Sequence, residues 1–547
     1  MFQLQTIAPA ALYFTDLDGR AFDIDLDALT GLSTEGRDPV SGQRRPDVNV
    51  AQDDTIAGVG DEKAGWIVTL TSGRTLTLAQ ARLAEHRDPH LWRVAPRPWM
   101  AAEAEGLPVH DYRAFLADDD TRRQALLHMA VHGFVRLSGA PAVAGEIETV
   151  VAAFGHVRET NYGRLFDVRT RHDPANLADT ALALAPHTDN PYRLSPPEIQ
   201  VLHCLSAAGA GGRSFLVDGL AVIAALKAEA PEDYDLLCRV PARFAWSDGE
   251  TFLEAEAPVL TPERIRYNPR SLQQVVSDDA NERAAWARAW DRFGTLSSAP
   301  AFGLAFDMTA GDMVLMDNRR VLHGRTAFDA SGEVVRHLQG GYADMDGVYS
   351  SLRRLTAARV VRDIEALEAL FESEVLSDTY GEDLSIRDHM LQSAEGAVLR
   401  NKGAQLVAAA LLHDIGWGMK GPHEHAAAAM VEPMLGESVA SLIRHHVDAK
   451  RYLVATRPDY AERLSAASVH TLKQQGGPMS EAECRAFEAL PDFELCLELR
   501  YLDEGGKELS APVSRFGDYR EVLRALMVRQ ALSGGAERQH SSSGRGL

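Results

Sequence analysis

Cysteine is scarce in this sequence. The four cysteines, at positions 204, 238, 484 and 496, are scattered, and no two of them have CxxC spacing. Such a distribution indicates neither a disulfide framework nor a cysteine-bound zinc cluster. Long apolar runs are missing as well. No uninterrupted stretch of about 18 apolar residues occurs, which is the length that a membrane-spanning helix needs.

The start of the chain lacks a targeting pattern, and the chain as a whole carries no net positive charge. "MFQLQTIAPAALYFTD" has no charged segment ahead of an apolar one, as a secretory signal peptide would. We therefore expect a cytoplasmic protein without a membrane partner. The formal net charge of −22 argues against nucleic acid as a partner. It also means that an anionic substrate needs a local cluster of basic residues.

The length of 547 residues suits about three or four domains, and the 45% hydrophobic content suits packed cores. Residues 1–95 carry alternating runs such as "GWIVTLTSGRTLTL", whose Ser-Gly pair fits a hairpin turn. They predict a small β-rich N-terminal module. Residues 96–356 mix short stretches of strand-like alternation with stretches of helical spacing. We expect a helix at "LAVIAALKAEA" and strands at "SFLVDG", "RIRYN", "DMVLMD" and "VVRHLQGGYADM".

Helical spacing dominates after "SSLRRLTAAR". The stretches "VVRDIEALEALFESE", "SIRDHMLQSAEGAVLR", "LVAAALLHDI" and "SVASLIRHHVDAKRYLVA" all show it, so residues 357–532 predict an all-α domain. The Gly/Ser-rich residues 533–547 predict a disordered tail. The expected fold class is therefore multidomain.

A histidine and an aspartate stand two residues apart in "PHTDNPYR". Side chains two apart on an extended strand face the same way, so His187 and Asp189 could bind one cation. Downstream, "DNRRVLHGRTAF" supplies His323. Two histidines and one carboxylate that leave three coordination positions open form the facial triad of non-haem Fe(II) oxygenases. An H-x-D pair alone is weak evidence, since a surface loop is the alternative.

An arginine strengthens this interpretation. Arg336 lies thirteen residues after His323 in "VVRHLQGGY". A guanidinium beyond the second histidine can hold the far carboxylate of 2-oxoglutarate through a bidentate pair. Arg336 and Tyr342 share parity along the expected strand, so both could point into one barrel. A structural salt bridge is the alternative for Arg336.

Several stretches together resemble γ-butyrobetaine hydroxylase and its TauD-type relatives: "NYGRLF", "PHTDNPYR", "LHC", "YNPR", "VLHGRTAF" and "RHLQGGY". The resemblance covers about residues 1–350. It implies a double-stranded β-helix (jelly-roll) core, Fe(II), 2-oxoglutarate and O2, and hydroxylation of a small trimethylammonium compound. Aromatic ring faces attract such a cation. The implied substrate-binding residues are an ammonium cage of Tyr162, Phe166 and Tyr342, and an anion-binding Asn268. Apart from the resemblance, we expect the guanidinium of Arg270 to help grip a phosphonate.

Two departures from that family matter. Its N-terminal module usually holds zinc through cysteines and a histidine, whereas residues 1–100 contain no cysteine, so we expect this zinc site to be lost. In the family a further aromatic cage residue lies eight positions before the first iron histidine. Asp179 stands there in this chain, with Asn176 nearby. We expect both to bind substrate in a more negative pocket, and the substrate need not be γ-butyrobetaine.

A second metal site is indicated by the adjacent His413 and Asp414 in "LLHDIGW". The commoner use of such a pair is a metal-dependent phosphohydrolase, which needs one upstream histidine, the pair itself and a late aspartate. His389 and Asp503 fill the other two roles. Two further histidines would allow a second metal ion, with Asp414 as the bridge. His446 shares a helical face with Ile443, Lys450 and Leu453, while "PHEHAAAAM" offers His423 or His425, and spacing alone leaves that choice open although His423 is favoured.

Shorter stretches in this region, "YGEDLSIRDHMLQ", "HVDAKRYL", "LSAASVHTLKQQGGPMS" and "LRYLDEGGK", closely resemble the HD-domain oxygenases of phosphonate breakdown over about residues 357–530. Members of that family split the C–P bond of a 1-hydroxyphosphonate with O2 at a mixed-valent Fe(II)/Fe(III) pair. The resemblance implies iron ligands His389, His413, Asp414, His423, His446 and Asp503. It implies phosphonate contacts at Lys450, Ser468 and Arg500, and a gate of Tyr380 and Glu382 near iron. This chain has Trp417 at the position where the aminoethylphosphonate-cleaving relatives have a histidine that touches the substrate.

The two resemblances fit one pathway for a small organophosphonate. The first oxygenase would hydroxylate C1 of 2-(trimethylammonio)ethylphosphonate, or of a less methylated 2-aminoethylphosphonate. The second would cleave the product to phosphate and glycine betaine, or a glycine derivative. The rivals are a γ-butyrobetaine-type hydroxylase fused to an HD phosphohydrolase, or to a nucleotide-sensing regulatory module. The sequence leaves open whether the chain forms a homodimer.

Overall fold

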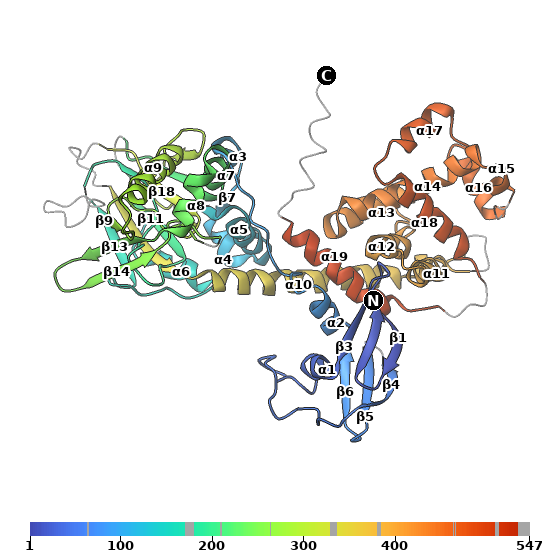
Figure 1. Ribbon diagram of the computed structural model, residues 1–547. Helices are drawn as coiled ribbons and strands as arrows, with labels where there is room; N and C mark the ends of the chain where they lie inside the picture. The colour runs from blue at the N-terminus through green and yellow to red at the C-terminus, as the bar shows by residue number, and fades with distance from the viewer. Residues whose placement is uncertain are drawn as a thin grey trace. The chain divides into compact units, whose positions relative to one another are not determined.

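The computed structural model describes residues 1–62, 65–169, 180–207, 211–262, 264–328, 336–379, 384–462, 464, 466–508 and 513–533. The chain divides into two compact units (Figure 1). One unit is Val94–Thr356, and the other joins Met1–Arg93 to Ala357–Leu547. The second unit therefore combines the β-rich start of the chain with its helical last third.

Two sheets form the centre of the Val94–Thr356 unit. The larger has six strands in the order β7-β8-β17-β11-β19-β9, with β7 and β8 parallel and the other neighbours antiparallel. The smaller has four antiparallel strands in the order β10-β18-β12-β16. The strand bounds are β7 Val109–Asp111, β8 Phe134–Ser138, β9 Leu165–Arg169, β10 Leu184–His187, β11 Ile199–Ser206, β12 Ser214–Asp218, β16 Gly303–Phe306, β17 Met313–Asp317, β18 Val321–Arg325 and β19 His337–Ala343.

Burial explains why these strands read as apolar runs. Every residue of β17, with the sequence MVLMD, is buried, as expected for a central strand covered on both faces. β12 passes directly into helix α7 (Gly219–Glu229), because the Asp218 carboxylate accepts a hydrogen bond from Leu220 N (3.0 Å) and caps the helix. Asp218 is also paired with buried Arg320 (2.8 Å). This strand and helix confirm the prediction for "SFLVDG" and the stretch after it.

A third sheet, in the order β14-β13-β15, packs with helices around its own apolar core. Trp286, Phe293 and Phe244 are the largest fully buried side chains there. The bounds are β13 Ala242–Ser247, β14 Phe252–Ala257 and β15 Leu272–Val275. The helices of this unit are α3 Ala101–Glu105, α4 Tyr112–Ala117, α5 Asp119–His132, α6 Glu146–Ala152, α7 Gly219–Glu229, α8 Pro231–Arg239 and α9 Ala280–Ser297.

The N-terminal module consists of two three-stranded antiparallel sheets and two short helices. Leu12, Phe14 and Val68 lie in its apolar core. The predicted hairpin is confirmed: Gly73 has φ +82° in the turn between β5 and β6, a conformation that suits glycine. The bounds are β1 Gln3–Ala8, β2 Ala11–Thr15, β3 Ala21–Asp25, α1 Leu26–Leu32, β4 Ile56–Glu62, β5 Gly65–Leu70, β6 Thr75–Ala79 and α2 Gln80–Arg87.

This module packs against the C-terminal helices. Gln3 Nε2 donates to Val398 O (3.1 Å), and Gly403 N donates to Leu17 O (2.9 Å). Arg529 forms an ion pair with Asp88 (2.7 Å). The sequence resemblance groups residues 1–95 with the following oxygenase domain, whereas these contacts group them with the last third of the chain.

The last third of the chain is helical. Alanine-rich α12 is buried along almost its whole length among its neighbours. α10 runs unbroken from Met345 to Phe371, so the expected domain boundary near 357 lies inside a helix and not in a linker. The helices are α10 Met345–Phe371, α11 Ile386–Leu399, α12 Ala404–Leu412, α13 His423–Leu435, α14 Glu437–Thr456, α15 Pro458–Ala461, α16 Ala466–Gln474, α17 Glu481–Glu488, α18 Phe493–Gly505 and α19 Arg520–Leu532.

One predicted strand is wrong. "RIRYN" forms no strand, and Ile265 makes only an isolated bridge to Leu260. Part of its backbone instead bonds to the loop that contains Thr188, since Tyr267 O accepts a hydrogen bond from Thr188 N (2.7 Å). Across the described ranges, no helix combines the length and the apolar character needed to cross a membrane. The chain is multidomain with a large helical C-terminal region, and the jelly-roll and HD-type assignments stay predictions.

Candidate active sites

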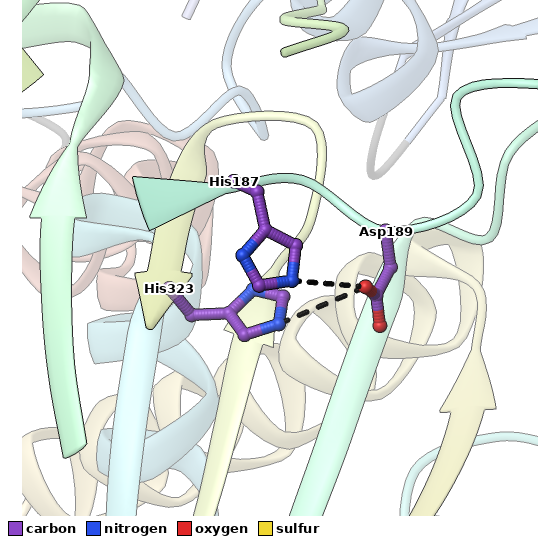
Figure 2. A group of neighbouring side chains, drawn as sticks. All are labelled: His187, Asp189 and His323. Atoms are coloured by element: carbon purple, nitrogen blue, oxygen red, sulfur yellow. Dashed lines mark ion pairs between the residues drawn. The ribbon is translucent and has the colours of Figure 1, made fainter. Parts of the chain in front are cut away.

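His187, Asp189 and His323 come together in the Val94–Thr356 unit (Figure 2). Their ligand atoms all lie within 4.8 Å of one another. Asp189 Oδ1 is 3.5 Å from His187 Nε2 and 3.8 Å from His323 Nε2. The two histidines are cross-strand partners on β10 and β18, which brings their ring centroids to 4.4 Å.

Asp189 reaches this position differently from the sequence expectation. His187 is the last residue of β10, and Asp189 lies in a bend beyond the strand, so strand parity is the wrong reason for their proximity. The bend is held by Asn318, whose side chain accepts from Asp189 N (2.6 Å) and donates to Asp189 O (3.0 Å). The next residue, Asn190, takes the left-handed conformation with φ +54°.

The protonation of this cluster suits metal binding. His187 Nδ1 donates to Ala185 O (2.8 Å), which leaves the Nε2 lone pair directed at the cluster. Burial, with His187 alongside, lowers the pKa of His323 to about 3, so this ring is neutral at physiological pH. Burial alone would raise the pKa of Asp189, but His323 and His187 outweigh it and hold that pKa below its usual range. Two imidazoles and one carboxylate are the donor set of a mononuclear Fe(II) centre.

The three aromatic residues expected to form the ammonium cage are in contact. Phe166 lies 5.8 Å from Tyr162 and 5.1 Å from Tyr342, measured between ring centroids. Gly340 makes room for this arrangement, because a Cβ there would meet the Phe166 ring at 2.3 Å. Two further rings join the cluster: Trp246 is 5.5 Å from Tyr162 and 5.8 Å from Tyr192.

Sequence reasoning missed those two rings for different reasons. Tyr192 belongs to the quoted motif "PHTDNPYR", and its hydroxyl donates to Asn190 Oδ1 (2.5 Å), so proximity to Asp189 was a usable signal. Trp246 lies on β13 of the separate three-stranded sheet, and nothing local in its sequence indicates that it meets Tyr162.

The expected anion-binding residues lie near the first cluster. Asn268 is buried, and its Nδ2 donates to Thr188 O (3.1 Å), so it also fixes the loop that carries Asp189. Arg270 is exposed, and its positive charge contributes to the low pKa of Asp189. Arg336 is buried beside the Phe328 ring (5.6 Å), and no carboxylate is paired with it among the residues that the structure describes. Its guanidinium therefore suits a carboxylate supplied by a ligand.

Four predicted site residues lie outside the described ranges. They are Asn176, Asp179, Tyr380 and Glu382.

The six residues expected to bind two iron ions form two neighbouring groups in the C-terminal helices. Within each group the ligand atoms lie within 4.8 Å of one another. Asp414 links the groups: its Oδ1 is 3.0 Å from His423 Nε2, and its Oδ2 is 3.7 Å from His413 Nε2. A carboxylate placed in this way can bridge two metal ions. The first group is His389, His413 and Asp503, and the second is Asp414, His423 and His446.

Backbone carbonyls orient three of these histidines alike. The Nδ1 atoms of His389, His413 and His446 donate to Gly506 O (2.8 Å), Ala410 O (2.9 Å) and Ile443 O (2.7 Å) respectively. Each Nε2 is consequently left to face the cluster. Burial alone would raise the pKa of both aspartates, but His413 and His423 hold the pKa of Asp414 well below the usual range, and Arg500 and His389 do the same for Asp503.

The helix ends explain how His423 joins the site and His425 does not. Gly416, just after the His-Asp pair, touches the start of α13, because a Cβ there would meet His423 O at 2.2 Å. This close approach places His423, the first residue of α13, next to Asp414. His425 is exposed, and His445 faces away to Asp448 (2.9 Å).

A cavity of about 110 Å³ opens beside these ligands and is lined by cations. Lys450 Nζ donates to Thr471 Oγ1 (3.0 Å), and Lys507 Nζ donates to Ser468 Oγ (3.1 Å). Lys507 and Thr471 were missed by the sequence analysis, although Lys507 ends the quoted stretch "LRYLDEGGK". Trp417 also lines the cavity, edge-on to His423 at 4.7 Å.

Arg500 lines the same cavity but is engaged by acidic partners. Its Nη atoms bond to Asp503 and Glu504, and its Nε donates to Tyr460 Oη (2.6 Å). One carboxylate oxygen of Asp503 is thus held by Arg500, while the other, Oδ1, faces His389 Nε2 at 3.2 Å. Arg500 therefore orients a predicted metal ligand, and Lys450 and Lys507 add further positive charge to the lining of the cavity.

Known proteins are similar in sequence to parts of this chain. The family model described as taurine catabolism dioxygenase TauD, TfdA family, matches residues 93–342. γ-Butyrobetaine dioxygenase from Pseudomonas sp. (strain AK-1) is 38% identical over 271 residues, covering 48% of this chain and 70% of that enzyme. The Homo sapiens enzyme of the same name is 31% identical, covering 46% and 67%. [1-Hydroxy-2-(trimethylamino)ethyl]phosphonate dioxygenase (glycine-betaine-forming) from Leisingera caerulea is 38% identical over 176 residues, covering 30% of this chain and 90% of that enzyme.

Proposed function

Because the chain belongs to the TauD/TfdA family of dioxygenases, close to γ-butyrobetaine dioxygenase and to the Leisingera phosphonate dioxygenase, we propose that it is a bifunctional oxygenase of organophosphonates. The first centre hydroxylates C1 of 2-(trimethylammonio)ethylphosphonate, or of a less methylated analogue. The second cleaves the C–P bond of the 1-hydroxy product. The observation that carries the proposal is that one chain holds two clusters of different donor composition, one with three ligand residues and one with six.

In the first centre, His187, Asp189 and His323 would hold Fe(II), and Arg336 would hold the far carboxylate of 2-oxoglutarate. When bound, Fe(II), 2-oxoglutarate and O2 supply the oxidant that converts C1–H to C1–OH, with succinate and CO2 as co-products. The aromatic cluster would enclose the ammonium group, since each well-placed ring face attracts a desolvated cation by roughly 0.5–2 kcal/mol. Asn268 and Arg270 would hold the phosphonate at the other end and so orient C1.

In the second centre, the two ligand groups would hold an Fe(II)/Fe(III) pair bridged by Asp414. The pair, when bound, supplies the chemistry that reduces O2. The overall reaction balances: the 1-hydroxyphosphonate and O2 give a carboxylate, phosphate and one proton. Lys450 and Lys507 would neutralise the phosphonate, with Ser468 and Thr471 as hydrogen-bond partners. In a chain with a net charge of −22, this local positive charge is what an anionic substrate requires.

A phosphohydrolase could use similar His and Asp ligands, and O2 separates the two functions. We expect iron-loaded protein to release phosphate from 1-hydroxy-2-(trimethylammonio)ethylphosphonate in air, with one O2 consumed per phosphate. Under anaerobic conditions release should stop, because C–P cleavage to a carboxylate is an oxidation. Equal phosphate release with and without O2 would replace the proposed oxygenase by a hydrolase.

A further inference from the structure

Oδ1 of the Asp189 carboxylate faces the two histidines, and the other oxygen, Oδ2, accepts hydrogen bonds from two buried side chains. Gln200 Nε2 donates to Asp189 Oδ2 (2.6 Å), and Tyr342 Oη donates to the same oxygen (2.8 Å). Gln200 and Tyr342 are directly opposite each other on β11 and β19, so they point to the same face of the sheet. Each is only 3% exposed. We propose that this cross-strand pair positions Asp189 as a one-oxygen metal ligand.

The number of lone pairs explains the effect. A carboxylate oxygen has about two acceptor positions, and the two donors fill those of Oδ2. Oδ1 is the oxygen that faces His187 Nε2 and His323 Nε2, at 3.5 and 3.8 Å. A carboxylate that bound through both oxygens would take a further coordination position. With Oδ2 occupied, three positions stay open for a chelating 2-oxo acid and O2.

The amide of Gln200 supports this role. Its Oε1 is buried and has no hydrogen-bond partner among the described residues. Turning the amide over would place this oxygen against Asp189 Oδ2, so the NH2 group must face the carboxylate. A buried acceptor without a partner is unfavourable, and an apolar side chain of similar size would avoid it. The benefit of the amide therefore lies in the hydrogen bond to Asp189.

Tyr342 adds a link to the substrate pocket. Its ring contacts Phe166 (5.1 Å), while its hydroxyl binds the metal ligand. An occupant of the aromatic cluster therefore touches the side chain that orients Asp189. This inference rests on the proposed iron site, and its effect on metal binding is expected before any phosphonate is present.

The test is an anaerobic Fe(II) titration of the full chain with saturating 2-oxoglutarate. The visible charge-transfer band of a 2-oxo acid chelated to Fe(II) reports only the centre that binds 2-oxoglutarate, even when the other centre holds iron. Tyr342→Phe keeps the ring and removes the hydroxyl, and Gln200→Leu removes the amide donor. Loss of a partner that orients a ligand typically costs 10–100-fold in metal affinity, so each variant should need about tenfold more Fe(II) at half-saturation.

Two reference variants separate the possible outcomes. Tyr112→Phe removes another buried hydroxyl bonded to a carboxylate, that of Glu146, and should titrate as wild type. His187→Ala removes a ligand and should abolish the band. A band that survives in this variant would show that the proposed Fe(II) site is wrong. If Tyr342→Phe and Gln200→Leu needed the same Fe(II) concentration as wild type at half-saturation, while His187→Ala lost the band, the positioning role would be overturned. A loss in only one of the two variants would overturn the pair.

Discussion

Histidines expected to bind metal in both sites are oriented by the same kind of hydrogen bond, from a ring nitrogen to a backbone carbonyl. A backbone carbonyl accepts from the Nδ1 of His187, His389, His413 and His446, and each Nε2 is left to face its cluster. The carboxylates of Asp189 and Asp503 follow a parallel pattern, with one oxygen held by protein donors and the other facing a histidine. Gln200 and Tyr342 act on Asp189, and Arg500 acts on Asp503. The ligands are therefore oriented by the fold before any metal arrives, which lowers the ordering cost of binding.

Lys450 gives a pH-dependent prediction at this scale. Burial, with the Arg500 charge nearby, lowers the pKa of Lys450 to about 8. The ammonium form predominates below that pKa and is lost as pH rises through it. KM for the supplied 1-hydroxyphosphonate should therefore rise above about pH 8, by up to about tenfold per unit.

The measurement is the pH profile of KM for wild type and Lys450→Met. Methionine keeps most of the stem but carries no charge, so the variant should have a raised KM already at neutral pH and a flatter profile. Exposed Lys473 on α16 provides a control through Lys473→Met. Identical profiles in wild type and Lys450→Met would exclude Lys450 as the titrating group.

At the scale of the element, the starts and ends of helices bring the second site together. His413 and Asp414 follow the end of α12, His423 begins α13, and Asp503 lies near the end of α18. α12 begins after Gly403, which has φ +80° and ψ 156°, a region open mainly to glycine. The backbone N–H of Gly403 also donates to Leu17 O of the N-terminal module.

Gly403→Ala should destabilise the unit that contains both segments. A residue forced into this backbone region costs about 1–3 kcal/mol, and the new Cβ would lie 3.2 Å from Asp18 Oδ1. The free energy of unfolding should fall by about that amount in denaturant titrations. Gly60→Ala is the matched control, because Gly60 has no positive φ and no atom within 4 Å of an added Cβ. Equal stability of the two variants would contradict the strain at Gly403.

Sequence reasoning succeeded where a periodic pattern decided the structure. The face of α14 that carries Ile443, His446, Lys450 and Leu453 is buried, as helical spacing predicts. It failed where tertiary hydrogen bonds decided. Asp189 faces His187 because Asn318 holds a bend, and neither strand parity nor local propensity contains that information. "RIRYN" has the composition of a strand, but its backbone bonds go to separate segments: Tyr267 bonds to Thr188, while Ile265 N and Arg266 N donate to Arg319 O and Val259 O.

Pairings between distant segments were the other limit. His323 could be proposed from its own motif, but its cross-strand register with His187 joins residues far apart in the chain. Trp246 reaches the aromatic cluster from a separate sheet, and Lys507 enters the cationic cavity from the segment after α18. Residue type and spacing indicate which groups can do chemistry, whereas the neighbours that tune them follow from packing.

At the scale of the whole molecule, the two centres predict the metal content of the chain. The proposed mononuclear and dinuclear sites should together hold up to about three iron ions per protein. Stoichiometric zinc is not expected, because the N-terminal module contains no cysteine thiolate. Elemental analysis of protein purified without added metal checks both numbers. One tightly held zinc ion that survives removal of iron would contradict the loss of the N-terminal zinc site.

The two chemistries should also separate by mutation, because the ligand sets lie in different units of the chain. His187→Ala removes one of three ligands from the first site and should stop 2-oxoglutarate turnover. Cleavage of supplied 1-hydroxyphosphonate should continue at the wild-type rate. Asp414→Ala removes the carboxylate between the two ligand groups of the second site and should have the opposite effect.

With 2-(trimethylammonio)ethylphosphonate as the starting substrate, Asp414→Ala should still consume 2-oxoglutarate and accumulate the 1-hydroxy compound, without releasing phosphate. His187→Ala should accumulate nothing. Mixing the two variant proteins should restore phosphate release if the intermediate diffuses between molecules, and phosphorus NMR follows all three species in one sample. Phosphate release from the parent phosphonate at the normal rate by Asp414→Ala alone would show that C–P cleavage does not depend on this site, and the two-step proposal would fail.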